Sequence, residues 1–397
     1  MVIFFLIILF IILWALIDFK LGRHFHIKRI LKQEFPFRKS TITLFNTGQK
    51  LYDDLFQQIE KATKHVHILF YILKDDKVSE AFLELLMDKA KQGLEVRLLL
   101  DRIGSNKLSK KKMKELRENG VFFTFCHIPK FPFYFYSLNE RNHRKISVID
   151  GKVGYIGGFN IGREYIGQDP KLGDWRDYHL RIEGEGVQDL QKQFLHDWED
   201  STKERLHLND LYFPPLLTGE ILHKFVPTDG AYLQHIFQEL IQTAKEELII
   251  GTPYFIPGKT IFNDLIEAAN RGVVVKIIVP MKADHFFVRE AAFPYFKQLL
   301  EAGCKVYRYY YGFFHAKVIV KDGQICDIGT ANFDKRSLYL NHEINCLIYD
   351  QPFVQLVKST LEKDLDFAEE LTLEDLKKRS LLQRGKEKIS TILSKFL

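Results

Sequence analysis

The sequence predicts an α/β protein in which two similar halves follow an N-terminal apolar helix, and an internal repeat is the main reason. A series of helix, strand, helix and strand begins near Leu55 and again near Leu240. Each series then ends in a short hairpin, from His143 and from His315. Strands that alternate with helices build mixed sheets covered by helices. Each half is therefore expected to be a mixed sheet flanked by helices, and 397 residues suffice for two such domains.

The first segment predicts a membrane anchor. Residues 2–17 carry no charge, and as a helix they would cover roughly 24 Å of hydrocarbon. The flank that follows is basic, with Glu34 as the nearby acid: Lys20, Arg23, Lys28, Arg29, Lys32, Arg38 and Lys39. Because cytoplasmic flanks carry an excess of Lys and Arg, we expect a single pass through the cell membrane with the remaining chain on the cytoplasmic side. The alternative is a cleaved signal peptide, but no basic region precedes the apolar run and no small-x-small site follows it.

The two hairpins are predicted from an Asp-Gly pair at the centre of each. They read HRKISVIDGKVGYIGG and HAKVIVKDGQICDIGT. Asp-Gly between alternating apolar runs is a strong hairpin signal, because both central residues of the tight turn need positive φ. The joint between the halves is expected within residues 201–217, where charges and two prolines interrupt the periodic pattern. The predicted segments are an anchor (1–18), a basic juxtamembrane segment (19–45), a first domain (46–212), a second domain (213–360) and basic amphipathic C-terminal helices (361–397).

Charge and cysteine content restrict the partners and the cofactors. The net charge is +6, and basic residues crowd at both ends of the chain, which favours an anionic partner. Anionic lipid and nucleic acid both fit that charge. The four cysteines show no C-x-x-C spacing and predict neither a disulfide framework nor a zinc cluster: Cys126, Cys304, Cys326 and Cys346. No cofactor and no metal ion are predicted.

The candidate site residues recur at matching positions in the two halves. Each hairpin opens with a His-x-Lys-x4-Asp motif, and side chains two apart on a strand point to one face, so each histidine is expected beside its lysine. An asparagine follows each motif at the same offset. The resulting candidates are His143, Lys145, Asp150 and Asn160 in the first half and His315, Lys317, Asp322, Thr330 and Asn332 in the second. A single His-x-Lys would mean little, but this recurrence indicates one shared site.

These residue types suit displacement at phosphorus. One imidazole can attack as a nucleophile while the other, protonated, gives a proton to the departing alkoxide. Lysines and amide groups, with the Thr330 hydroxyl as a further donor, can hold the phosphoryl oxygens, whose charge grows in the transition state. A carboxylate on the second nitrogen of each imidazole would fix its tautomer. Asp177 and Glu343 are the candidates for this orienting role.

The paired motifs resemble the HKD signatures of the phospholipase D superfamily, from about Leu51 to Tyr349. This resemblance implies two α/β domains related by pseudo-two-fold symmetry and a phosphohistidine intermediate. It also implies that His143 is the nucleophile and His315 the acid. Asp150 and Asp322 are then expected to fix the hairpins rather than to act as acids.

Within that superfamily, the wording resembles bacterial cardiolipin synthases in four stretches, RNHRKISVIDGKVGYIGGFNIGREY, WRDYHLRIEGEGV, TPYFIP and GTANFDKRSLYLNHEIN. The resemblance implies transfer of a phosphatidyl group between two phosphatidylglycerol molecules, with cardiolipin and glycerol as products. Phosphatidylglycerol and cardiolipin in an anionic membrane are the implied partners, and nucleic acid is disfavoured. The family usually carries two N-terminal membrane segments where this chain shows one.

Three alternatives remain open at this stage. A hydrolytic phospholipase D, or another phosphatidyltransferase, differs only in what accepts the phosphatidyl group. A nuclease of the same superfamily would use the same motifs, and a catalytically silent membrane scaffold would need neither of them intact. Two aromatic stretches, residues 131–136 and 307–314, are predicted to be apolar walls that keep water from the cleft.

Overall fold

The computed structural model describes the chain except residues 207–208, 285–287, 380–384, 388–389 and 391–397. The first half contains β1 (Arg38–Thr47), β2 (His65–Phe70), β3 (Glu95–Asp101), β4 (Phe122–Cys126), β5 (Ile146–Ile149), β6 (Val153–Gly157) and β7 (Trp175–Gly184). Its helices are α2 (Gly48–Lys61), α3 (Lys77–Lys91), α4 (Lys110–Glu118), α5 (Tyr134–Asn139) and α6 (Gly186–Thr202), and α1 (Val2–Arg29) precedes this half.

The second half repeats this series. Its strands are β8 (Ile221–Asp229), β9 (Glu247–Gly251), β10 (Val274–Pro280), β11 (Lys305–Tyr309), β12 (Phe313–Phe314), β13 (Val318–Lys321), β14 (Ile325–Gly329), β15 (His342–Ile348) and β16 (Ala368–Glu370). Its helices are α7 (Leu233–Gln242), α8 (Gly258–Asn270), α9 (Val288–Glu301), α10 (Lys335–Tyr339), α11 (Gln351–Leu365) and α12 (Leu373–Lys377).

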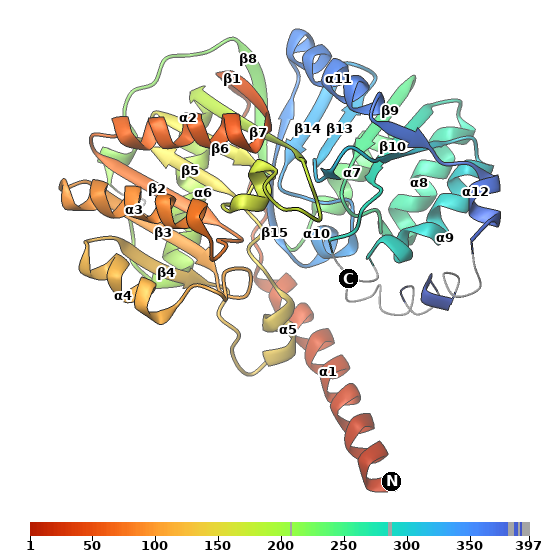
Figure 1. The fold of residues 1–397 in the computed structure, drawn as a ribbon, viewed down its shortest axis with the longest axis horizontal. Coiled ribbons are helices and arrows are strands. Elements are labelled where there is room, and N and C mark those ends of the chain that lie inside the picture. Colours follow the sequence, from red (N-terminus) through yellow and green to blue (C-terminus); the bar gives the residue numbers. More distant parts are fainter. Residues whose placement is uncertain (207–208, 285–287, 380–384, 388–389, 391–397) are drawn as a thin grey trace.

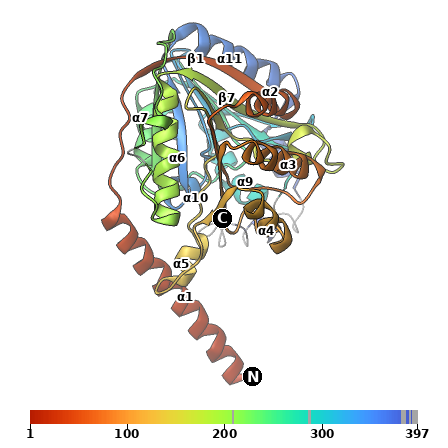
Figure 2. The same cartoon turned by 90° about the vertical axis from the view of Figure 1, so that its left-hand side faces the viewer.

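The two halves form one continuous mixed sheet, which confirms the predicted fold class. The strand order is β16-β11-β10-β9-β13-β14-β15-β8-β1-β7-β6-β5-β2-β3-β4. From β11 to β8 and from β4 to β1, the order of corresponding strands is the same, so the halves are related by pseudo-two-fold symmetry. Helices α6 and α7 lie together on one face of the sheet, and α2 and α3 lie on the other (Figure 2).

The symmetry axis passes between β1 and β8, which pair antiparallel with Ser40 opposite Ile221. The sheet thus includes Arg38–Thr47, whereas the sequence predicts residues 19–45 to be a juxtamembrane segment outside the first domain. The strand reads RKSTITLFNT, and its polar residues gave no apolar alternation by which to recognise it. Strands β1 and β8 join the halves, and each begins before the repeat that the sequence shows from Leu55 and from Leu240.

The Asp-Gly hairpins are confirmed. Asp150 and Asp322 both have φ of 52°, and the following Gly151 and Gly323 have φ of 65° and 61°. The Asp150 carboxylate accepts backbone N–H groups of residues 63–65 at 2.8–2.9 Å. The Asp322 carboxylate accepts those of residues 245–247 at 2.8–3.1 Å. Each aspartate therefore ties its turn to the chain that leads into the neighbouring strand, β2 or β9.

Helix α1 projects away from the two halves and carries the N-terminus at its far end (Figure 1). It is the described helix that is long and apolar enough to cross a membrane. It continues to Arg29, beyond the predicted anchor of residues 1–18, because its last turns dock on α5. There the Asp18 carboxylate accepts the Tyr136 N–H at 2.8 Å, and a side chain at Gly22 would collide with Tyr136. The predicted amphipathic helices of residues 361–397 lie partly outside the described residues.

Candidate active site

The two motif histidines are each held by the backbone of the opposite half. The His143 N–H donates to the His342 carbonyl at 2.9 Å, and the His315 N–H donates to the Arg176 carbonyl at 2.7 Å. These carbonyls belong to β15 and β7, the strands on either side of the central pair. Each accepting residue directly precedes a predicted orienting carboxylate. The backbone thus brings each imidazole beside an acid from the other half.

The side chain of each histidine also contacts a carboxylate of the opposite half. His143 Nδ1 lies 2.9 Å from Glu343 Oε2, and His315 Nδ1 lies 2.6 Å from Asp177 Oδ2. The two acids occupy corresponding positions in the halves. Asp177 lies two residues before His179, which pairs with Gly157 at the end of β6. Glu343 lies two residues before Asn345, which pairs with Gly329 at the end of β14. With Nδ1 engaged by a carboxylate, Nε2 of each imidazole is the nitrogen left for chemistry.

Both carboxylates and both histidines are buried, and burial shapes their charges. Burial would raise the pKa of Asp177 and of Glu343, but neighbouring lysine and histidine outweigh it and lower both. Burial lowers the pKa of His143, against the opposing effect of Glu343. Burial, with a contribution from Lys317, lowers the pKa of His315 to about 4. Without a bound anion, the site therefore holds ionised carboxylates and neutral imidazoles.

The motif lysines lie behind the histidines rather than on the wall of a cavity. Lys145 Nζ donates to the His143 carbonyl at 2.7 Å, and Lys317 Nζ lies 3.3 Å from Asp177 Oδ2. Both side chains are almost fully buried. Burial lowers the pKa of each lysine, while the Glu343 carboxylate opposes this at Lys145 and the Asp177 carboxylate opposes it at Lys317.

A cavity of about 630 Å³ lies between the halves and brings together four of the predicted residues, His143, His315, Asn160 and Asn332. Rings border both histidines: Tyr71 lies 4.9 Å from His143 and Trp175 lies 4.7 Å from His315, between ring centroids. The wall also carries the basic residues Lys74, Lys171 and Arg336. Tyr71, Lys74 and Lys171 lie outside both the repeated motif and the stretches that resemble cardiolipin synthases. Trp175 and Arg336 lie within those stretches, but the motif pattern predicts no site role for them.

The two asparagines are held by neighbours from their own halves. Asn160 Oδ1 accepts the Ile72 N–H at 3.0 Å, which fixes its amide at the cavity wall. Asn332 Nδ2 lies 3.3 Å from Asp334 Oδ2, and its buried Oδ1 has no hydrogen-bond partner among the described residues. Asn160 Nδ2 lies 3.3 Å from the Tyr165 hydroxyl, so in each amide the Nδ2 group already donates one of its two N–H bonds to a neighbour.

Thr330 is turned toward Glu343 instead of the cavity. Its hydroxyl donates to Glu343 Oε2 at 2.6 Å, and the Ser337 hydroxyl donates to Oε1 at 2.8 Å. In the first half the corresponding position is Gly158, where any side chain would collide with Asp177. Sequence reasoning missed Ser337, because it lies in α10 outside the repeated motif.

The prediction that two aromatic stretches, residues 131–136 and 307–314, form the walls of the active-site cavity is wrong. Among the described residues, those that line the cavity include none from 131–136 or 307–314. Phe133 instead stacks on Phe25 of α1 at 5.4 Å between centroids, and Phe313 and Phe314 are fully buried in β12. Phe133 and Tyr136 of the first stretch pack on α1, whereas Phe313 and Phe314 of the second stretch belong to the core and its Tyr310 and Tyr311 are exposed.

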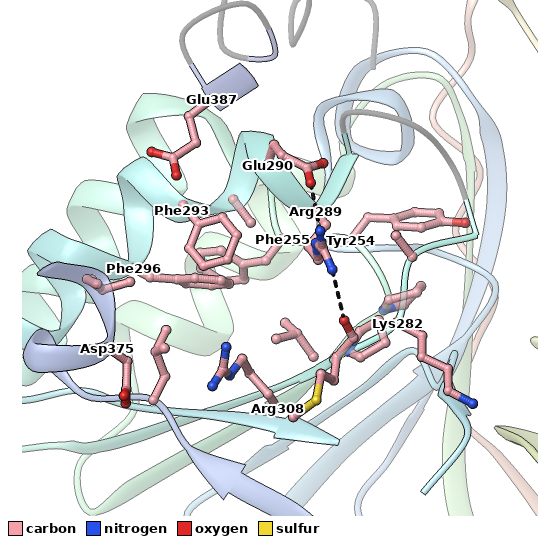
Figure 3. Close-up of a pocket in the computed structure, with 18 of the residues that line it drawn as sticks. Tyr254, Phe255, Lys282, Arg289, Glu290, Phe293, Phe296, Arg308, Asp375 and Glu387 are labelled. Carbon is pink, nitrogen blue, oxygen red and sulfur yellow. Dashed lines mark hydrogen bonds and ion pairs between the residues drawn. The ribbon is translucent and has the colours of Figure 1, made fainter. Parts of the chain in front are cut away.

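A second, smaller cavity of about 180 Å³ adjoins the first and shares Tyr254 and Asp284 with it. Figure 3 shows the rings of Phe293 and Phe296 on one side and Arg308 reaching in from the other. Each arginine of its wall has an acidic partner, in the pairs Arg289–Glu290, Arg308–Glu369 and Arg379–Glu387. The wall of this cavity therefore combines apolar rings with charges of both signs that offset one another.

Duplicated α/β halves that exchange a histidine and a carboxylate across one cavity define an enzyme of the phospholipase D type. The family described as "Cardiolipin synthase, PLD-like domain" matches residues 55–198 and 237–365. The chain belongs to this cardiolipin synthase family.

Similar proteins agree with that assignment. The chain is 45% identical to the minor cardiolipin synthase ClsB of Bacillus subtilis (strain 168) over 392 residues, which are 98% of each protein. It is 40% identical over 362 residues to cardiolipin synthase 2 of Staphylococcus epidermidis, covering 90% of this chain and 74% of that protein. The phosphatidylserine synthase of Haemophilus influenzae Rd KW20 has the same fold, with a TM-score of 0.69 at 17% identity over 91% of this chain and 95% of that one.

Proposed function

We propose that the chain is a cardiolipin synthase that transfers a phosphatidyl group from one phosphatidylglycerol to a hydroxyl of another, with release of glycerol. The observation that carries this proposal is the pair of histidines, each held by a carboxylate of the opposite half across one cavity. Near-full-length identity of 45% to a cardiolipin synthase supports the choice of lipid.

The proposed reaction has two displacements. His143 Nε2 attacks the phosphorus of the first phosphatidylglycerol, and the bond from phosphorus to the glycerol oxygen breaks. Protonated His315 gives its proton to that oxygen, so glycerol leaves neutral. His315, now neutral, takes the proton of a hydroxyl on the second phosphatidylglycerol, whose oxygen then displaces His143 from phosphorus. Cardiolipin forms and both histidines return to their starting states.

The negative charge of the substrate favours protonation of His315, which is neutral in the free site. His315 must be protonated to act as an acid, and its pKa of about 4 in the free site keeps it neutral near pH 7. An anionic phosphodiester in the cavity favours the imidazolium electrostatically, and Asp177 already supports it. The proton is therefore taken up with the substrate. Asn160 and Asn332 contact the phosphoryl oxygens, while Lys145 and Lys317 stabilise the developing negative charge from behind.

The positions of Thr330 and of helix α1 in the structure suggest a role for each. We assign Thr330 to hold Glu343 in place of the predicted phosphate contact, because its hydroxyl donates to that carboxylate. Helix α1 anchors the chain in the cell membrane, and its basic flank favours the cytoplasmic side for both catalytic halves. The same flank draws the enzyme toward anionic lipids such as phosphatidylglycerol and cardiolipin.

The test is to incubate the purified protein with vesicles of labelled phosphatidylglycerol and to separate cardiolipin, phosphatidic acid and glycerol. We expect cardiolipin and glycerol in equal amounts, and conversion of cardiolipin back to phosphatidylglycerol when glycerol is added. His143→Ala and His315→Ala should each abolish turnover without loss of fold. Phosphatidic acid as the sole lipid product, even with glycerol present, would instead identify a hydrolytic phospholipase D.

A further inference from the structure

A cluster of ligand-type side chains lies where the anchor helix meets the catalytic halves. His26 comes from α1, Glu140 from the end of α5 and His342 from the start of β15. Glu140 Oε1 lies 3.2 Å from His26 Nδ1 and 2.9 Å from His342 Nε2. The three ligand atoms all lie within 4.8 Å of one another. Two imidazole nitrogens and one carboxylate oxygen therefore converge on one point.

The spacing suits a tetrahedral ion. Zinc binds imidazole nitrogen and carboxylate oxygen at about 2.0–2.2 Å, which places neighbouring ligand atoms roughly 3.3 Å apart. The two distances to Glu140 Oε1 lie close to that value. Two histidines with one carboxylate are a donor set typical of zinc and related divalent transition ions, whereas magnesium and calcium prefer oxygen ligands alone.

The surroundings of His342 are those of a metal-bound histidine. Its other ring nitrogen, Nδ1, lies 3.2 Å from Asp229 Oδ1, and Asp229 is itself paired with Arg144. A carboxylate on the second nitrogen fixes the tautomer that directs Nε2 to an ion and makes that nitrogen a better ligand. This contact is independent of the three converging ligands and points to the same ion position.

A fourth position and an entry path are also present. His127 Nδ1 lies 3.8 Å from Glu140 Oε1, and its ring lies 4.3 Å from that of His342 between centroids. The side chains of His26, Glu140, His342 and His127 keep 12–19% of their surface exposed, so an ion can reach them. The Tyr136 hydroxyl also lies 2.6 Å from His26 Nδ1 and would have to give up that contact when the nitrogen binds an ion.

We propose that His26, Glu140 and His342 form a binding site for zinc or a similar divalent transition ion, with His127 nearest the fourth position. The ion would join the anchor helix to β15. It would take no part in the chemistry, because its contact with the reacting atoms runs only through the backbone: the His342 carbonyl accepts the His143 N–H. The ligands come from distant segments, with Glu140 and His342 202 residues apart, so no sequence spacing could reveal the site.

The test uses the full-length protein in detergent, without a polyhistidine tag, stripped with chelator and titrated with zinc by calorimetry. We expect one zinc ion per chain. His26→Gln and Glu140→Gln should weaken binding at least about 100-fold, and Asp229→Asn should weaken it about 10- to 100-fold. His24→Gln is the matched control, since His24 is exposed on the same helix. Magnesium in excess should not compete.

A second measurement keeps the test decisive if a variant folds poorly. Cobalt in place of zinc should give the visible absorption of a tetrahedral ion, and His26→Gln, at the edge of the cluster, should abolish it. Absence of zinc binding to the wild-type protein would show that the cluster is only an ion-pair junction. Equal binding by wild type, His24→Gln and His26→Gln would also overturn the proposal.

Discussion

Asp177 and Glu343 differ from ordinary buried acids in that each serves a histidine of the opposite half. We expect Asp177→Asn and Glu343→Gln to lower kcat by roughly 10²- to 10⁴-fold with little change in KM, because an amide can donate to Nδ1 and so select the wrong tautomer. The measurement is cardiolipin formation on phosphatidylglycerol vesicles. Glu183→Gln, on the same strand as Asp177, is the control. Undiminished kcat in both variants would contradict the orienting role.

Thr330 provides a narrower test of how Glu343 is held. Loss of a hydrogen bond to a charged group is worth about 1.5–3 kcal/mol, so Thr330→Val should lower kcat by roughly 10- to 100-fold. Thr330→Ser keeps the hydroxyl and should restore most of the activity. Both variants are compared by kcat and by thermal unfolding. If serine and valine variants are equally impaired, the hydroxyl does not position Glu343.

Asp327 makes the stability of the fold depend on pH. Burial raises its pKa to about 7, against a 2.6 Å hydrogen bond from Asn345. In the unfolded chain the pKa is about 4, so the native state binds the proton more tightly. The stability this gives is full below about pH 4 and is lost as the pH rises to 7.

Asp327→Asn should therefore raise the unfolding temperature at pH 8, by roughly 2 °C or more, and the gain should shrink toward pH 5. Calorimetry at both pH values measures this, with the exposed Asp53→Asn as control. A gain that is the same at pH 5 and pH 8 would show that the carboxyl is not the cause.

Among single residues, the sequence predicts the site residues that recur in both halves, but it does not predict those that occur in one half alone. His143 and His315 are predicted from the repeated motif, whereas Asp177 and Glu343 are predicted from the need for a carboxylate on the second nitrogen of each imidazole. The direction of the Thr330 hydroxyl could not be predicted, since it depends on the side chain opposite it in the fold. Of the rings beside the histidines, Tyr71 directly follows β2 and Trp175 opens β7, so the two rings do not occupy corresponding positions in the halves.

Among the elements, helix α1 combines two functions along its length. Its first part is exposed and apolar, while residues 18–29 dock on α5 and on the catalytic halves. We expect deletion of residues 1–17 to weaken binding to vesicles while the unfolding temperature stays unchanged. Deletion of residues 1–29 should also lower the unfolding temperature, because the contacts of Asp18 and Phe25 are lost. Flotation with vesicles and thermal unfolding measure the two effects separately.

The end of α1 and the start of the sheet were the elements that sequence reasoning placed least well. Hydropathy falls at Asp18, and a charged residue at this position predicts the end of the anchor. The helix continues because Asp18 and His26 find partners in α5 and just after it, and such partners are set only by tertiary structure. The helix–strand repeats and both hairpins were foreseen, since local periodicity and turn chemistry determine them.

For the whole molecule, the balance between transfer and hydrolysis depends on how dry the shared cavity is. Leu172 and Ile72 are half-buried apolar residues of its wall. Leu172→Ser and Ile72→Ser should admit water and raise the share of phosphatidic acid among the products, without abolishing turnover. Leu211→Ser is the control, because Leu211 is 68% exposed. An unchanged product ratio in both wall variants would mean that acceptor binding, not exclusion of water, sets the outcome.

The exchange of histidine and carboxylate between the halves has a consequence for inheritance. Because His143 relies on Glu343 and His315 on Asp177, neither half of the coding sequence carries a complete acid–base pair. A recombinant that joined the first half of this chain to the second half of a distant relative would take each histidine from one parent and its acid from the other. A change in either carboxylate therefore alters the surroundings of a histidine encoded 200 or 138 codons away.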